Sequence, residues 1–394
     1  MKNKPLASLV IIVVLLVSSL AFNSNYFGKV NASTNVNTTI TSDTTWTKAN
    51  SPYSLSAPTM VNIGVSLTIE PGVIVDLNGY YIIVNGTLRA IGSAEEKVYF
   101  NGGSISFTPT SRDSVIENVV LSYNGSILVT NSSPKIAYSS IDSIDVWDGS
   151  PEISFNTITS GINIYDGSPS IFNNDIRGRL RVFWGAPSIS NNVINGSFYI
   201  YRGEPSITNN TIDARIVVEN GPTTISNNKI SDGVHADARG GPITITNNEI
   251  NSKSGFPLIL VLGVHADISG NKIFGNNATG ISVNLRISSA SIANNQIQGC
   301  GIGIHADAGA DAGDVQIVGN LIINNTVGIH VWAKGDVHDN TIAENSIGIQ
   351  CAASSDLIIS HNNFLNNSKY NLEILHLQDL NAIYNWWGEQ PTLH

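Results

Sequence analysis

Four aromatic residues recur at 18-residue intervals and are the first candidates for a binding surface: Trp147, Tyr165, Phe183 and Tyr201. Each is the fourth residue of a short segment whose first and third residues are apolar. Alternate side chains of a β-strand share a face, so if the apolar residues point inward, the rings point outward. Exposed rings of this kind can stack against the apolar faces of sugars. Alternatively, the rings only stack on one another and stiffen the sheet.

Polar residues accompany the rings on the same predicted face. Asp145, Arg181 and Tyr199 each stand two residues before a ring, where they can hydrogen-bond to sugar hydroxyl groups. Asp148 and Asp166 lie one repeat apart, so their carboxylates can share a Ca²⁺ ion. With an arginine to neutralise a uronate, the face also suits a polysaccharide lyase or a uronate epimerase.

His305, Asp307 and His330 form a second candidate site. His305 and Asp307 are separated by one residue and therefore share a face of a strand. His330 occupies the equivalent place one repeat later, about 4.8 Å away if the repeats stack as parallel strands. Two imidazoles and a carboxylate suit Zn²⁺ or Cu²⁺. Nothing in the sequence requires a cofactor, but these residues predict a transition-metal site.

A repeat that runs along most of the chain must position these side chains. Segments such as SPSIFNNDI (168–176) and APSISNNVI (186–194) place an Asn two residues before a final Ile. Asn tolerates the left-handed backbone of a tight corner, and stacked Asn amides can hydrogen-bond to one another in a ladder. Ser139 breaks a series that otherwise comprises Asn118, Asn156, Asn174, Asn192, Asn210, Asn228, Asn248, Asn271, Asn295, Asn320, Asn340 and Asn362.

The repeat predicts an all-β fold, a right-handed parallel β-helix in which each coil contributes three short strands and an Asn ladder marks one corner. Ile and Val from every coil then form a dry core between the sheets. A left-handed helix of hexapeptides also completes a turn in 18 residues, but the apolar spacing within these coils is uneven.

The remaining features concern organisation and partners. Lys2 and Lys4 precede an apolar stretch at 6–22, as in an export signal or membrane anchor, so we expect a secreted, cell-surface or periplasmic protein. The formal net charge is −10 and no basic run exists, which argues against nucleic acid as a partner. The expected segments are a signal peptide or anchor at 1–32, a flexible linker at 33–40, an N-terminal cap and first coils at 41–110, repeats at 111–388 and a tail at 389–394.

One coil departs from the pattern because its FPLILVL segment, 256–262, is apolar on both faces. Leu258, Leu260 and Leu262 are predicted to point outward in a row. Such a patch indicates either a protein partner or cover from a loop.

The Asn-containing coils resemble those of the right-handed parallel β-helix superfamily. That group includes pectate lyases, polysaccharide hydrolases, mannuronan epimerases and the periplasmic NosD-like proteins. Residues 67–100 and the Asn-Trp-Trp-Gly sequence at 385–388 are similar to the first and last coils of exported members. The resemblance is specific for fold and much less so for function. It implies an exported and often carbohydrate-related protein.

We therefore expect an extracytoplasmic binding or scaffold protein whose ligand is a polysaccharide or cell-surface glycan, held by the aromatic face. The first alternative is a polysaccharide lyase or uronate epimerase on the same face. The second, implied by the NosD-like relatives, is an accessory role in metal delivery.

Overall fold

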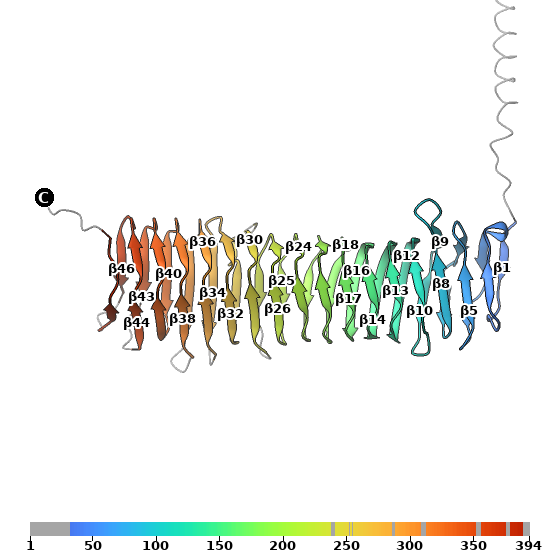
Figure 1. The fold of residues 1–394 in the computed structure, drawn as a ribbon, viewed down its shortest axis with the longest axis horizontal. Helices are drawn as coiled ribbons and strands as arrows, with labels where there is room; N and C mark the ends of the chain where they lie inside the picture. Colours follow the sequence, from blue (N-terminus) through green and yellow to red (C-terminus); the bar gives the residue numbers. More distant parts are fainter. Residues whose placement is uncertain are drawn as a thin grey trace, which may run out of the picture.

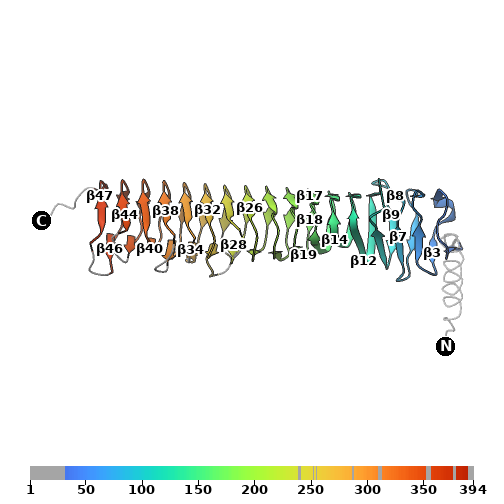
Figure 2. The same cartoon turned by 90° about the horizontal axis from the view of Figure 1, so that it is seen from below.

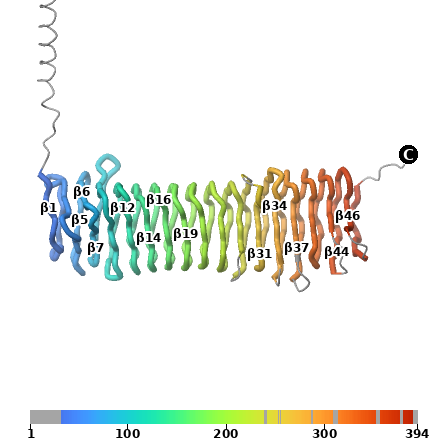
Figure 3. Tube along the Cα trace, turned by 180° about the vertical axis from the view of Figure 1, so that it is seen from behind, coloured from blue at the N-terminus to red at the C-terminus, as the bar shows by residue number. Residues whose placement is uncertain are grey.

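The computed structural model describes residues 32–237, 241–251, 253, 255–285, 288–308, 313–351, 356–375 and 379–388. They form one straight stack of coils with the two ends of the chain at opposite ends of the stack (Figure 1). Two further views show that each turn of the chain lies directly beside the next (Figures 2 and 3). The predicted leader, up to residue 31, and the predicted tail at 389–394 lie outside the described residues.

Each coil contributes three strands, as predicted, and all the strand pairs are parallel. We call the three stacks of strands sheets 1, 2 and 3, in the order in which a coil meets them. β12 (Val119–Ser132), β14 (Ser140–Gly149) and β16 (Thr157–Asp166) run through the corner between sheets 2 and 3 and belong to both. In the described part of the chain the helical structure is limited to one 3-10 turn, η1 (Lys48–Asn50), and no helix there is long and apolar enough to cross a membrane.

The remaining strands divide among the sheets as follows. Sheet 1 contains β2 (Thr44–Trp46), β5 (Ser66–Ile69), β8 (Thr87–Ile91), β11 (Val115–Glu117), β13 (Lys135–Ala137), β15 (Glu152–Ser154), β17 (Ser170–Phe172), β20 (Ser188–Ser190), β23 (Ser206–Thr208), β26 (Thr223–Ser226), β29 (Ile243–Thr246), β32 (Ala266–Ser269), β35 (Ala290–Ala293), β38 (Val315–Val318), β41 (Gly335–His338), β44 (Leu357–Ser360) and β47 (Asn381–Ile383). Sheet 2 contains β1 (Thr34–Val36), β3 (Tyr53–Leu55), β6 (Ile74–Asp76), β9 (Val98–Asn101), β18 (Asp175–Ile176), β21 (Val193–Ile194), β24 (Thr211–Ile212), β27 (Lys229–Ile230), β30 (Glu249–Asn251), β33 (Lys272–Phe274), β36 (Gln296–Gln298), β39 (Leu321–Ile323), β42 (Thr341–Ala343) and β45 (Asn363–Leu365). Sheet 3 contains β4 (Thr59–Val61), β7 (Tyr81–Val84), β10 (Ser104–Phe107), β19 (Arg179–Val182), β22 (Phe198–Ile200), β25 (Ile216–Val218), β28 (Val234–Ala236), β31 (Ile259–Leu262), β34 (Thr279–Leu285), β37 (Ile302–Ala308), β40 (Val327–Trp332), β43 (Ile347–Cys351) and β46 (Tyr370–Ile374).

The core consists of columns of apolar side chains that run along the stack. In sheet 1, for example, Ile189 pairs in register with Ile171 on one side and Ile207 on the other. All three are fully buried. Burying an Ile side chain stabilises a fold by about 1.5–3 kcal/mol. Each coil therefore depends on its neighbours to cover both sides of its inward-facing row.

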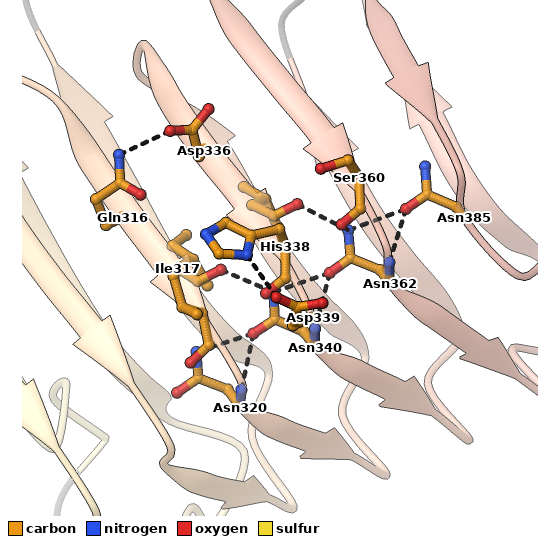
Figure 4. A network of polar contacts seen from close by, with 12 residues as sticks. Gln316, Ile317, Asn320, Asp336, His338, Asp339, Asn340, Ser360, Asn362 and Asn385 are labelled. Atoms are coloured by element: carbon orange, nitrogen blue, oxygen red, sulfur yellow. Dashed lines mark hydrogen bonds and ion pairs between the residues drawn. The ribbon is translucent and has the colours of Figure 1, made fainter.

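The Asn residues form the predicted ladder, and their amides lie inside the stack. The backbone N–H and Nδ2 of Asn192 both donate to Oδ1 of Asn210, at 2.8 and 3.0 Å. Nδ2 of Asn192 also donates to the carbonyl oxygen of Ile171, at 2.9 Å. Figure 4 shows the same arrangement near the C-terminal end, in Asn320, Asn340, Asn362 and Asn385. Every ladder side chain thus satisfies polar groups of two neighbouring coils.

The residue before each ladder Asn, and not the ladder Asn itself, has the left-handed backbone of the corner. Our prediction that the ladder Asn recurs because it tolerates this backbone is therefore wrong. Asn191 has a φ of 56°, whereas its neighbour Asn192 is not among the residues with positive φ. Asn118, with a φ of 51°, occupies the corner and not the ladder. Ser139 does take a ladder place, because its Oγ accepts a hydrogen bond from the backbone N–H of Val119 at 3.0 Å.

A second, shorter ladder was not predicted. The backbone N–H groups of Cys300 and Asn325 donate to Oδ1 of Asn325 and Asn345, respectively, both at 2.9 Å. Asn345 continues the series to Asn367 at 3.1 Å. These residues lie at the corner between sheets 2 and 3, where the later coils are longer.

Aromatic rings stack on one another near both ends of the described stack. At the N-terminal end, Trp46 and Tyr53 stack with their ring centroids 4.9 Å apart. At the C-terminal end, Trp387 stacks on the buried ring of Phe364 at 4.8 Å. The prediction of a flexible linker at 33–40 is wrong, because β1 pairs with β3 and Ile40 forms a bridge with Val61. Short polar residues suggested a linker, but their backbone completes the first coil.

We predict that Asn210→Ala lowers the free energy of unfolding by about 2–4 kcal/mol, because it leaves the buried N–H of Asn192 and the carbonyl of Ile189 without partners. Urea denaturation followed by circular dichroism measures the change. Asn209→Gly is the control, because Asn209 is exposed, has a φ of 57° and can be replaced by Gly without strain. An Asn210→Ala variant as stable as Asn209→Gly would contradict the structural role of the ladder.

Candidate functional site

The four predicted aromatic residues lie on the outer face at the end of sheet 3 and form what we call the aromatic ladder. Successive ring centroids of Trp147, Tyr165, Phe183 and Tyr201 are 3.8, 4.9 and 4.8 Å apart, and the planes differ by at most 14°. The outward orientation is therefore confirmed, and Trp147 is 49% exposed. Neighbouring rings cover one another's faces, so only Trp147 and Tyr201 have a face without a ladder neighbour. A row of sugars cannot stack along this ladder as we expected.

The neighbouring column on the same face is mainly polar. Nδ2 of Asn163 donates to Oδ1 of Asp145 at 2.7 Å. Arg181 pairs in register with Tyr199 of the next coil, and Nε of Arg181 is buried without a hydrogen-bond partner. The structure thus brings Asp145, Arg181 and Tyr199 onto one face beside the ladder, as the sequence predicted.

A groove of about 600 Å³ lies at the next corner, between the ends of the sheet 3 strands and the beginnings of the sheet 1 strands. Its walls come from four consecutive coils. The lining residues are Asp166, Gly167, Ser168, Trp184, Gly185, Ala186, Arg202, Gly203, Glu204, Asn220, Gly221 and Pro222.

A column of glycines forms the floor of this groove. Gly167, Gly185, Gly203 and Gly221 have φ values of 97°, 87°, 104° and 90°, which side-chain-bearing residues rarely adopt. A Cβ atom on Gly185 would lie 2.0 Å from the carbonyl oxygen of Gly167. Only glycine therefore lets the coils stack at this corner, and the floor of the groove is bare backbone that a ligand can approach closely.

Trp184 and three charged side chains form the walls. Trp184 is 50% exposed, and the guanidinium carbon of Arg202 lies 4.7 Å from its ring centroid. Arg202 belongs to the following coil and lies over one face of the indole, whereas Asp166 lines the groove from the preceding coil. Asp166 and Glu204 are exposed, and neither forms an ion pair with any described residue. A half-exposed indole can stack on an apolar ring, and the polar groups beside it can hydrogen-bond to the substituents of that ring.

A smaller cavity of about 380 Å³ continues this surface and is lined by Val217, Val218, Glu219, Asn220, His235 and Asp237. Asn220 lines both cavities. Nε2 of His235 is buried without a hydrogen-bond partner. Burial lowers the pKa of His235, the positive charge of Arg215 lowers it further, and the negative charge of Asp237 acts in the opposite direction.

The histidine pair predicted to bind a metal is brought together, but without a complete set of ligands. The rings of His305 and His330 stack at 4.9 Å, and His330 meets the edge of Trp332 at 5.3 Å. Asp307 pairs in register with Trp332, two positions beyond the His305–His330 pair. Among the described residues, no group of three or more His, Cys, Asp or Glu side chains is arranged to hold a metal ion.

The predicted calcium ligands are engaged within their own turns. Oδ1 of Asp148 accepts a hydrogen bond from the backbone N–H of Gly149, and Oδ1 of Asp166 accepts one from Gly167, both at 2.7 Å. These contacts hold each carboxylate at the start of its glycine corner. These hydrogen bonds explain why Asp precedes the glycine, and the explanation does not require a bound cation.

The predicted leucine patch is smaller than expected. Leu260 and Leu262 lie half-exposed on the outer face, in register with Ser282 and Asn284. Leu258 is only 1% exposed, so the prediction that it points outward is wrong. It precedes β31 at a corner, where strict alternation between the two faces does not hold.

Comparison with known families agrees with this geometry. Residues 198–347 match the family model described as a right handed beta helix region. The chain is a right-handed parallel β-helix. No curated protein matches the β-helix, so its function must be argued from its own surface.

The sequence contained a signal for the groove of the β-helix that our prediction of the site did not use. Three Gly-x-Pro tripeptides, at 167–169, 185–187 and 203–205, recur at the same 18-residue interval as the rings. They mark a second corner of each coil, and the residue before each glycine lines the groove. Trp184, Arg202 and Glu204 therefore join Asp166 as candidate binding residues.

We predict that Gly185→Ala destabilises the β-helix by about 3 kcal/mol more than Gly64→Ala does. Both glycines have positive φ, 87° and 74°, but a Cβ on Gly64 would meet no atom within 4 Å. The difference between their thermal unfolding midpoints isolates the close packing at the groove floor. Equal midpoints would show that the glycine column is not required for stacking.

The lowered pKa of His235 also gives a pH dependence. In the unfolded chain His235 binds a proton below its ordinary pKa of 6.5, whereas in the folded chain it resists protonation. The free energy of unfolding therefore decreases as the pH falls below about 6.5. His235→Gln should make the urea midpoint less sensitive to pH between pH 7.5 and pH 5.5. An unchanged slope in the variant would contradict the burial of a neutral imidazole.

Proposed function

We propose that the β-helix is an extracytoplasmic polysaccharide-binding protein whose ligand lies in the glycine-floored groove. The observation that carries this proposal is the half-exposed indole of Trp184 above a bare backbone floor, flanked by Asp166 and Glu204. The extracytoplasmic part rests on Lys2, Lys4 and the apolar stretch that follows them.

The groove offers the contacts that a sugar requires. The indole stacks on the apolar face of a pyranose ring, and the carboxylates accept hydrogen bonds from hydroxyl groups. The glycines allow the ligand to approach the backbone without meeting a side chain. The lining residues span four coils, or roughly 14 Å, so the groove accommodates several linked sugars rather than one.

In this proposal the aromatic ladder is a rigid wall and not the stacking platform. Three of the four ladder rings immediately precede a residue of the groove wall: Tyr165 precedes Asp166, Phe183 precedes Trp184, and Tyr201 precedes Arg202. Stacked rings restrict the rotation of this segment, which reduces the entropy lost when a ligand binds. Tyr165, Phe183 and Tyr201 thus contribute to binding through the residues that they support.

The groove supports binding better than uronate lyase or epimerase chemistry. Those reactions need a cationic group that faces the uronate and a base beside the sugar carbon. The groove lining includes one arginine, Arg202, and its guanidinium lies on Trp184. Arg181 is not among the lining residues. A role in metal delivery has less support, because the structural observation in its favour is the stacked His305–His330 pair.

We predict that Trp184→Ala reduces affinity for the glycan at least tenfold, because a stacking contact of this kind contributes about 0.5–1.5 kcal/mol beyond the area it buries. A glycan array identifies the ligand, and isothermal titration calorimetry compares the variants. Trp147→Ala is the matched control, because Trp147 is equally exposed but does not line the groove.

Two results would contradict the proposal. One is the absence of any bound glycan on an array that includes neutral, acidic and amino sugars. The other is a loss of affinity in Trp147→Ala with normal affinity in Trp184→Ala, which would place the ligand on the aromatic ladder.

A further inference from the structure

The connected surface of the two cavities is strongly acidic. Four carboxylates line it, those of Asp166 and Glu204 in the groove and those of Glu219 and Asp237 in the smaller cavity. All four residues are exposed, and none forms an ion pair with another described residue. No described cation therefore neutralises them, although Oδ1 of Asp166 also accepts the hydrogen bond from Gly167.

Among the described lining residues, the groups that can carry positive charge are Arg202 and His235, whose pKa is lowered. Arg202 lies over the indole of Trp184, where it is 4.7 Å from the ring centroid. His235 stays neutral near pH 7 because burial lowers its pKa. The lining therefore carries an excess of negative charge, in a chain whose formal net charge is already −10. Such a surface repels a polyuronate and attracts a cationic chain.

The carboxylates are also distributed along the direction in which a polymer would lie. Asp166 and Glu204 come from coils that are two apart, or roughly 10 Å, and Glu219 and Asp237 come from adjacent coils, roughly 5 Å apart. Asn220 joins the two cavities. Negative charges thus recur along the groove, which suits a ligand with a positive charge on each repeating unit.

Resting on the proposed function, we propose that the polysaccharide bound in the groove is an amino-sugar polymer with free, protonated amines. Trp184 stacks on the sugar rings, and the carboxylates of Asp166 and Glu204 pair with the ammonium groups. The smaller cavity extends the same contacts through Glu219 and Asp237. A basic peptide would also satisfy the charges, so the test below includes polylysine as the competing ligand.

Calorimetry with four probes tests this inference: fully deacetylated glucosamine hexamer, its N-acetylated counterpart, an oligogalacturonate of equal length, and polylysine. We expect the deacetylated hexamer to bind at least tenfold more tightly than the acetylated one at low ionic strength. The difference should shrink at high salt, because salt screens exposed charges. The double variant Asp166→Asn with Glu204→Gln should lose about tenfold in affinity for the deacetylated hexamer.

The matched control removes two negative charges from sheet 1, through Glu152→Gln with Asp267→Asn, and this variant should bind the deacetylated hexamer normally.

Tighter binding of the acetylated hexamer, still sensitive to Trp184→Ala, would overturn the amino-sugar inference and leave the proposed function intact. Preference for oligogalacturonate would also overturn it. Polylysine binding as tight as that of the deacetylated hexamer, in both wild type and Trp184→Ala, would reduce the effect to general charge attraction. Failure of all the sugars would count against both proposals.

Discussion

The hydrogen bonds that each ladder Asn makes to its neighbouring coils are the constraint on which the rest of the β-helix depends. Oδ1 of Asn210 accepts from the backbone and the side chain of Asn192, and its Nδ2 donates to a carbonyl one coil back. A shift of a coil by one residue would leave these buried groups without partners and turn the apolar residues outward. The ladder therefore fixes the register, and the register decides which side chains face the solvent.

The groove follows from this register together with a steric requirement at another corner. With coils held in line, the coils that form the groove turn after sheet 3 at glycines that avoid the backbone of the preceding coil, as Gly185 does beside Gly167. The same regularity stacks Phe183 on Tyr165 and so fixes the segment that carries Trp184. The same repeat thus produces both the glycine floor of the groove and the ordered side chains of its wall. The charges placed on that wall then determine which ligand the groove attracts.

The sequence predicted the fold because its Asn and Ile residues recur at a spacing that only stacked coils explain. It also predicted which face carries Trp147 and its neighbours. It left open whether their rings stack on one another or on a ligand, since the orientation of a ring about its χ angles is set by contacts between coils. Leu258 was placed wrongly for a related reason: alternation along a strand does not extend through a corner. The groove itself was missed because its lining residues combine a glycine corner with residues from four coils.

A crystal structure of the β-helix with the deacetylated glucosamine hexamer tests the central claim most directly, namely that the groove built by the stacked glycines is the binding site. The account predicts a sugar ring against the indole of Trp184 and amino groups within hydrogen-bonding distance of Asp166 and Glu204. A hexamer bound along the edges of the aromatic ladder, or at any other face with the groove empty, would contradict it.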